Sequence, residues 1–246
     1  PAARALTRLS WVERGVFPSA GTYDSPVYSV WQPFNSIEVH WRAHVPPGGT
    51  LSLAVRALVD GAGWTEWIRL VPDAHAAPRR QGGGTYAVPV LLPPCTALRY
   101  RVQLEPGFEG QPVRLDEVEI ACVDTRGQEL RYLAEVPLVD GWIVSRAGWG
   151  ADESLRFDED GQEIWPPRYA PVQKVIVHHT ATQDDPPDPA AVVRAIYAYH
   201  AVTQGWGDIG YNFLIDWRGT VYEGRYGGPN VVGSHTAGYN TGTLGI

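Results

Sequence analysis

Four histidines and one tyrosine in the second half of the chain have types and spacings suited to catalysis or metal binding. His178 and His179 directly follow the apolar run 174–177, which predicts a strand buried on both faces. Successive strand residues face opposite sides, so only one of the two imidazoles can point into a given groove. A neutral imidazole there can bind zinc. The plainer alternative is a hydrogen-bonded structural pair.

The other candidates occupy a helix end, a hairpin and a loop. His200 lies at the end of a predicted helix, where a histidine can also simply complement the helix dipole. Tyr211 begins a predicted hairpin. A phenol beside a metal can stabilise an oxyanion, although many strand tyrosines are only packed. His235 lies in the small-residue loop 231–236, which could approach a ligand closely.

Composition excludes several classes of protein. The chain has 246 residues, 44% hydrophobic and 19% charged, as in a globular protein of one or two domains. A net charge of −7 argues against a nucleic-acid partner. No run approaches the roughly 18 apolar residues of a membrane helix, so no membrane span is expected.

The elements that must position these residues differ between the two halves. Residues 36–124 alternate apolar and polar side chains between Pro/Gly turns, which predicts an antiparallel β-sandwich. The second half reads as mixed α/β. Asp188 and Pro189 have the types of an N-cap and a first helical residue, and residues 211–223 read as a hairpin around 217–219.

The two cysteines have a symmetrical placement. Cys95 and Cys122 share the midpoint 108.5 with the predicted turn 106–111, so a hairpin would set them opposite each other. This spacing predicts a disulfide and, with it, an oxidising, extracytoplasmic location. The alternative is two buried free thiols.

Five segments in order resemble the peptidoglycan-recognition-protein family, which includes the phage lysozyme-type zinc amidases. They are 145–151, 175–181, 205–214, 221–225 and 233–240. The resemblance implies a mixed central sheet flanked by helices. It also implies zinc-dependent N-acetylmuramoyl-L-alanine amidase activity, which cleaves the amide between the lactyl group of muramic acid and L-Ala.

The resemblance assigns roles to individual positions. It makes His178 a zinc ligand and Tyr211 the catalytic tyrosine. Thr180, His200 and His235 match positions that line the groove for the muramyl peptide. The family's other zinc ligands follow the strand that begins at residue 243. The amidase domain is therefore expected to be truncated at its C-terminus, and this 246-residue form is expected to be inactive.

A weaker resemblance concerns the first half. Residues 34–48, 60–61 and 64–67 look like the β-sandwich that precedes the amidase domain in some bacterial cell-wall proteins. Such sandwiches bind carbohydrate or act as spacers. Trp64 or Trp67 could stack on a sugar ring, although core packing is the commoner use of a tryptophan.

Together these features predict two domains. Residues 1–135 form an antiparallel, jelly-roll-like β-sandwich, and residues 136–246 form an α/β amidase domain with a mixed central sheet. The expected protein is secreted, associates with the cell wall, uses zinc and acts on peptidoglycan. The alternatives are a non-catalytic peptidoglycan-binding module and a structural surface protein.

Overall fold

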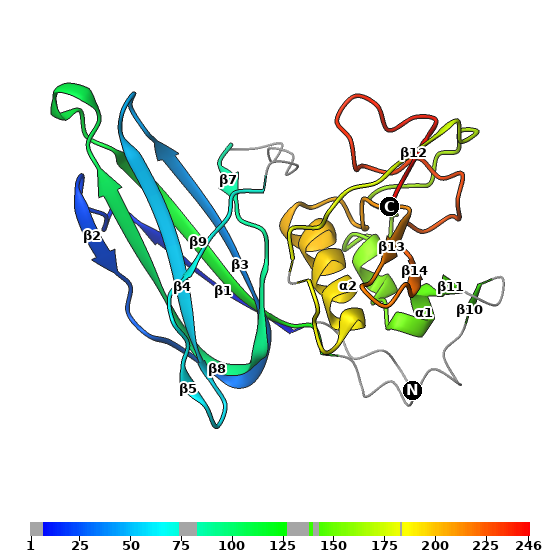
Figure 1. The fold of residues 1–246 in the computed structure, drawn as a ribbon, viewed down its shortest axis with the longest axis horizontal. Coiled ribbons are helices and arrows are strands. Elements are labelled where there is room, and N and C mark those ends of the chain that lie inside the picture. The colour runs from blue at the N-terminus through cyan, green and yellow to red at the C-terminus, as the bar shows by residue number, and fades with distance from the viewer. Residues whose placement is uncertain (1–6, 74–82, 127–137, 140–142, 183) are drawn as a thin grey trace. The chain divides into compact units, whose positions relative to one another are not determined.

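The computed structural model describes residues 7–73, 83–126, 138–139, 143–182 and 184–246 (Figure 1). The chain divides into two compact units between Asp124 and Thr125. The predicted domain boundary at 135/136 lies outside the described residues and stays a prediction.

The N-terminal unit is built from antiparallel strands. In chain order they are β1 (Thr7–Arg14), β2 (Gly21–Asp24), β3 (Tyr28–His44), β4 (Thr50–Val59), β5 (Gly63–Trp64), β6 (Ile68–Arg69), β7 (Thr85–Tyr86), β8 (Val90–Glu105) and β9 (Arg114–Asp124). The main strand order is β1-β9-β3-β8-β4-β5. The predicted sheet-rich, antiparallel character of this half is confirmed, and its jelly-roll-like topology stays a prediction.

Strand β3 changes partner along its length. Residues 28–37 pair with β8, and residues 36–44 pair with β9, with a register shift between Phe34 and Ser36. The alternating side chains of β3, β4, β8 and β9 meet in one apolar core, where Val55, Leu98 and Tyr100 are fully buried. The period-two pattern in the sequence is therefore the pattern of a sheet with one buried face.

The predicted Cys95–Cys122 disulfide is wrong. Both residues are free, buried thiols. Residues 106–111 do connect β8 to β9, but β3 lies between these two strands in the sheet. Cys95 therefore pairs with Phe34, and Cys122 pairs with Ile37. The expected extracytoplasmic location loses this support.

The C-terminal unit combines short helices with short strands. Its elements are β10 (Leu138–Val139), β11 (Ile143–Val144), α1 (Arg146–Trp149), β12 (Lys174–Ile176), α2 (Pro189–Ala198), a π-helical turn (Tyr199–Thr203), β13 (Phe213–Ile215), β14 (Val221–Glu223) and β15 (Thr243–Gly245). Strands β10-β11-β14-β13 form one sheet with parallel and antiparallel pairs. Strands β12 and β15 form a separate parallel pair.

Local sequence signals fix α2 and the following hairpin. The Asp188 side chain accepts a hydrogen bond from the Ala191 backbone N–H at 3.1 Å, and Pro189 occupies the first turn, as predicted. The β13–β14 hairpin also forms as predicted. No helix in the described ranges has the length and apolar character needed to cross a membrane.

The predicted burial of residues 174–177 is wrong. Val175 is 59% exposed and Val177 is 77% exposed. Among the described strands, β12 pairs with β15 alone, and two of its three residues, Lys174 and Val175, are exposed. An apolar run therefore predicted the strand but not its surroundings.

Candidate functional site

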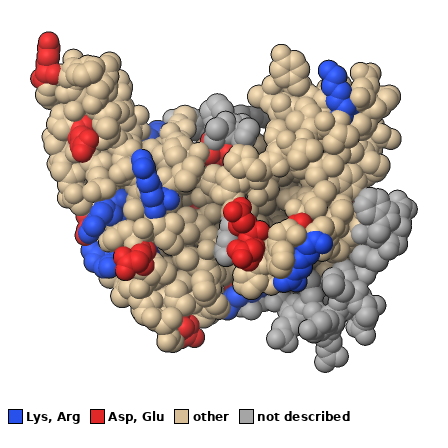
Figure 2. Space-filling view, in the orientation of Figure 1, with Lys and Arg blue, Asp and Glu red and all other residues tan. Residues whose placement is uncertain are grey.

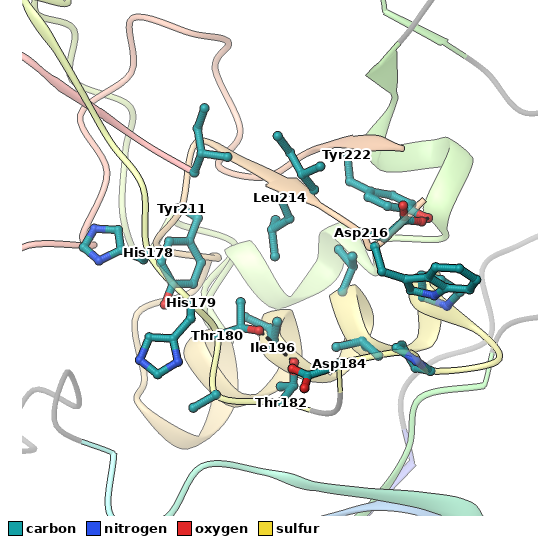
Figure 3. Close-up of a pocket in the computed structure, with 18 of the residues that line it drawn as sticks. His178, His179, Thr180, Thr182, Asp184, Ile196, Tyr211, Leu214, Asp216 and Tyr222 are labelled. Atoms are coloured by element: carbon teal, nitrogen blue, oxygen red, sulfur yellow. Dashed lines mark hydrogen bonds between the residues drawn. The ribbon is translucent and has the colours of Figure 1, made fainter. Parts of the chain in front are cut away.

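A pocket of about 330 Å³ lies between the segment after β12, helix α2 and the β13–β14 hairpin (Figure 3). His178, His179 and Tyr211 line one end, and Asp216 lies at the opposite end. Its wall along α2 and β13 is apolar and includes Ile196 and Leu214. A pocket with an apolar wall and polar groups at both ends suits a ligand of mixed character.

Three of the predicted site residues lie close together: His178 and Tyr211, which line the pocket, and His235, which does not. The Nε2 atom of His178 lies 3.1 Å from Nδ1 of His235. The His178 ring centroid lies 5.9 Å from that of Tyr211. His179 lines the same pocket as His178 (Figure 3), although strand alternation predicted that only one of the two would face a given groove. Strand β12 ends at Ile176, before both histidines, so alternation does not set their directions.

The protonation of His235 follows from its neighbours. Its Nε2 atom lies 3.2 Å from Oγ1 of Thr243, and that hydroxyl donates to the carbonyl of Tyr239 at 2.8 Å or of Asn240 at 3.0 Å. A hydroxyl has one proton, so when Thr243 donates it to either carbonyl, its oxygen accepts from the Nε2–H of His235. This assignment leaves Nδ1 of His235 unprotonated and facing His178.

Burial keeps His235 neutral. The residue is 4% exposed. Removal from water, followed by the nearby charge of His178, lowers the pKa of His235 to about 4. Gly245 permits this close packing, because a Cβ atom there would lie 2.3 Å from Cγ of His235.

His200 has a different environment. It is buried, its Nδ1 accepts a hydrogen bond from the Gly210 backbone N–H at 3.1 Å, and its ring stacks on Trp206 at 4.7 Å. Its centroid lies 5.7 Å from that of Tyr211. His200 thus supports the segment that carries Tyr211, and within the described chain neither His200 nor His235 lines the pocket.

Thr180 does line the pocket. Its hydroxyl oxygen lies 2.7 Å from that of Thr182. The two hydroxyls lie on the loop after β12, on the same wall as Asp184 (Figure 3). The ligand-contacting role of Thr180 stays a prediction.

A buried ionic cluster below Tyr211 was not predicted from the sequence. Asp208 accepts from Arg146 at 2.9 Å and from Arg225 at 2.7 Å, and all three side chains are almost fully buried. The backbone N–H of Arg225 also donates to the carbonyl of Tyr211 at 2.8 Å. The sequence predicted a structural role for residues 208–210. It did not predict the two arginine partners of Asp208, because no local pattern shows that residues 146 and 225 converge there.

The described residues do not form a complete catalytic zinc site. Zinc enzymes commonly supply three protein ligands. Within the described part of the chain, no three His, Cys, Asp or Glu side chains come together around one point. The closest arrangement is the facing pair of nitrogens on His178 and His235.

Comparisons with known proteins concern the C-terminal unit. Residues 168–246 match a family described as N-acetylmuramoyl-L-alanine amidase. Over 118 residues the chain is 39% identical to peptidoglycan-recognition protein LE of Drosophila melanogaster, covering 47% of this chain and 32% of that protein. Over 80 residues it is 44% identical to the human N-acetylmuramoyl-L-alanine amidase, covering 31% of this chain and 14% of that enzyme.

A solved structure gives a similar alignment. Peptidoglycan recognition protein LE in complex with tracheal cytotoxin, a monomeric diaminopimelic acid-type peptidoglycan, is 37% identical. The match covers 43% of this chain and 58% of that chain, with a TM-score of 0.36. A TM-score of this size does not itself show a shared fold, so the relationship rests on sequence.

Proposed function

We propose that the C-terminal unit, in which residues 168–246 match the N-acetylmuramoyl-L-alanine amidase family and which is similar to peptidoglycan-recognition proteins, acts on peptidoglycan. The proposed reaction is hydrolysis of the lactyl–L-Ala amide of a muramyl peptide. The observation that carries this proposal is the meeting of His178 and Tyr211 at one end of the pocket.

The side chains of the pocket suit both the polar amides and the apolar groups of such a substrate. Thr180 and His179 offer hydrogen bonds to the amides of a stem peptide, while Ile196 and Leu214 offer apolar contact. The Tyr211 hydroxyl is the group that would donate to the oxygen on which charge develops as the amide is attacked. His200 and His235 hold the surrounding loops, as their burial and hydrogen bonds indicate.

His178 is the one described residue that we assign to the zinc of this family. We propose His178 as one ligand, with the remaining ligands outside the described residues. Bound zinc would act as a Lewis acid and activate water. The described residues do not supply a complete set of zinc ligands, so the roles proposed here are those of the protein side chains.

A second function is peptidoglycan binding without hydrolysis. One observation favours it, namely that no three metal-binding side chains converge in the described part of the chain. In that case the pocket would hold the muramyl peptide and release it unchanged. The family relationship supports both functions equally.

One pair of assays separates hydrolysis of peptidoglycan from binding without hydrolysis. Cleavage is followed as release of stem peptide from muramyl peptides, with zinc or with chelator, and binding is followed by calorimetry. Tyr211→Phe is expected to lower turnover by roughly 10²–10³, the usual cost of a lost oxyanion donor. Tyr169→Phe is the matched control, since Tyr169 is 64% exposed and does not line the pocket.

Each outcome assigns one function. Cleavage that Tyr211→Phe reduces supports the amidase. Binding with no cleavage in added zinc supports the second function. Absence of both binding and cleavage would show that neither proposal describes this chain. His178→Ala, with His44→Ala as its exposed control, tests the ligand assignment by zinc titration.

We propose that the N-terminal unit is a β-sandwich domain joined to the amidase domain. We also propose that the protein works outside the cell, at the wall that contains its substrate.

A further inference from the structure

We propose that the outer face of the sheet formed by β2, β8 and β4 binds an acidic polysaccharide. This face, named here the arginine–tryptophan face, consists of Arg56, Arg69, Arg99, Arg101, Trp64 and Trp67. It belongs to the N-terminal unit and is independent of the peptidoglycan pocket. In Figure 2, basic side chains gather on the side of this unit that carries β4 and β8.

Strand register places the four arginines on one face. Arg56 on β4 lies opposite Arg99 on β8, and Ala54 lies opposite both Arg101 and Arg69. Directly opposite residues in an antiparallel pair point to the same side. The intervening residues Val55 and Tyr100 are fully buried, so the arginines are on the outer face.

The face carries more positive charge than its own acids neutralise. Asp24 is bound by Arg101 at 2.6 and 2.7 Å, and Glu105, at the end of β8, accepts from Thr50 at 2.9 Å. Within the described residues, Arg56, Arg69 and Arg99 form no ion pair. Nearby guanidinium groups, Arg101 first, hold the pKa of Asp24 below its usual value.

This surplus is unfavourable without a ligand. Like charges directly opposite on neighbouring strands destabilise a sheet, and Arg56 faces Arg99 in that way. The chain as a whole has a net charge of −7, so the cluster is not an effect of a basic composition. An anion bound across the two strands would remove the repulsion.

Cation–π contacts hold the guanidinium groups in place. Arg101 lies 4.3 Å from the Trp67 ring centre, and Arg56 lies 4.8 Å from Trp67 and 4.9 Å from Trp64. Arginines and tryptophans therefore alternate in a series of contacts, Arg101–Trp67–Arg56–Trp64. Side chains fixed in this way lose little further entropy when a ligand binds. The buried Nε of Arg56 has no hydrogen-bond partner among the described atoms.

Trp64, the last residue in this series of contacts, favours a sugar as the ligand. Trp64 has a guanidinium on one side and remains 38% exposed. An exposed indole offers a flat apolar surface that suits the C–H face of a pyranose ring. A guanidinium pairs with a carboxylate through two parallel hydrogen bonds. Together these groups fit a chain of sugars that carry carboxylates, such as a polymer of hexuronic acid.

The test measures calorimetric binding of the full chain to an oligogalacturonate hexamer at low salt. Its methyl ester keeps the rings and removes the charge, and we expect it to bind at least about tenfold more weakly. Polyphosphate supplies charge without rings, and an oligothymidylate supplies both in another class of polymer. We expect both to bind more weakly than the hexamer.

Matched variants assign the binding to this face. Trp64→Ala and Arg69→Gln are each expected to weaken binding by about tenfold, as loss of one anchoring contact does. Their controls are Trp31→Ala, on a residue that is 84% exposed, and Arg114→Gln, on an exposed arginine of β9. Arg69→Gln alone suffices if Trp64→Ala does not fold, because Arg69 has an exposed side chain.

Several results would overturn the proposal. They are no binding of the hexamer, equal binding of the methyl ester or of polyphosphate, tighter binding of the oligothymidylate, or equal losses in the control variants. Loss of amidase activity or of muramyl-peptide binding has no bearing on this test, because it concerns the other unit.

Discussion

The Nε2 atom of His178 and the Nδ1 atom of His235 lie 3.1 Å apart, although 57 positions separate the two residues in the chain. The parallel pairing of β12 with β15 brings them together, because His178 follows β12 and Thr243 at the start of β15 contacts His235. When its hydroxyl donates to the carbonyl of Tyr239 or Asn240, Thr243 accepts from Nε2–H and leaves Nδ1 of His235 as the unprotonated nitrogen. A hydroxyl group outside the pocket thereby sets the hydrogen bond that His178 makes.

Thr243→Val should release this tautomer preference. Valine has a similar shape but cannot accept the proton of Nε2, so His235 should populate both tautomers. Nitrogen-15 NMR of the imidazole rings reports this directly, and the unprotonated Nδ1 signal of His235 should weaken. Stability should fall by about 1 kcal/mol, the usual net value of one hydrogen bond.

Thr220→Val is a suitable control, because Thr220 lies in the β13–β14 turn and has no contact with His235 among the described residues. An unchanged His235 spectrum in Thr243→Val would contradict the assignment.

The stability of the C-terminal unit should fall with acid because of His235. Its folded pKa of about 4 lies below the ordinary value of 6.5, so the unfolded chain binds more protons between these values. The contribution is fully present above pH 6.5 and is lost as the pH falls toward 4. Its size is on the order of 3 kcal/mol.

Urea unfolding at several pH values, with chelator present, measures this slope. His235→Gln removes the titrating group and should show a flatter dependence between pH 4 and 6.5. The same slope in wild type and His235→Gln would show that other groups cause the acid sensitivity.

Local signals in the sequence predicted much of this unit. The Asp188 and Pro189 cap, helix α2 and the β13–β14 hairpin depend on contacts between residues close in the chain, and each is confirmed. These features require no knowledge of distant partners.

Features that depend on distant partners were missed. The pairing of cysteines required β8 and β9 to be neighbours, and the insertion of β3 between them cannot be read from a turn. The exposure of Val175 and Val177 depends on which elements cover β12. The convergence of Arg146 and Arg225 on Asp208 likewise joins three separate segments.

Thiol titration should find two free cysteines in each denatured, unreduced chain. In the native protein both should react slowly, because Cys95 and Cys122 are buried and burial raises the pKa of the Cys122 thiol to about 12. Ellman's reagent with and without denaturant gives both values. Cys122→Ser should reduce the denatured count to one, and a count of zero in wild type would restore the disulfide.

Asp208→Asn should be among the most destabilising single substitutions in the C-terminal unit. The carboxylate of Asp208 is the shared partner of two buried guanidinium groups, Arg146 and Arg225, and it also accepts from the backbone N–H of Tyr226 at 3.0 Å. Removing one partner of a buried ion pair leaves uncompensated charge and costs about 3–5 kcal/mol.

Asp24→Asn is the matched control, because it breaks an ion pair with Arg101 whose side chains are each 33% exposed. Exposed pairs contribute about 0–1 kcal/mol, so this variant should unfold at nearly the wild-type urea concentration. Asp208 also anchors the segment that leads to Tyr211, so Asp208→Asn should weaken muramyl-peptide binding at urea concentrations too low to unfold the chain. Equal unfolding midpoints for the two variants would show that the buried cluster contributes little to the fold.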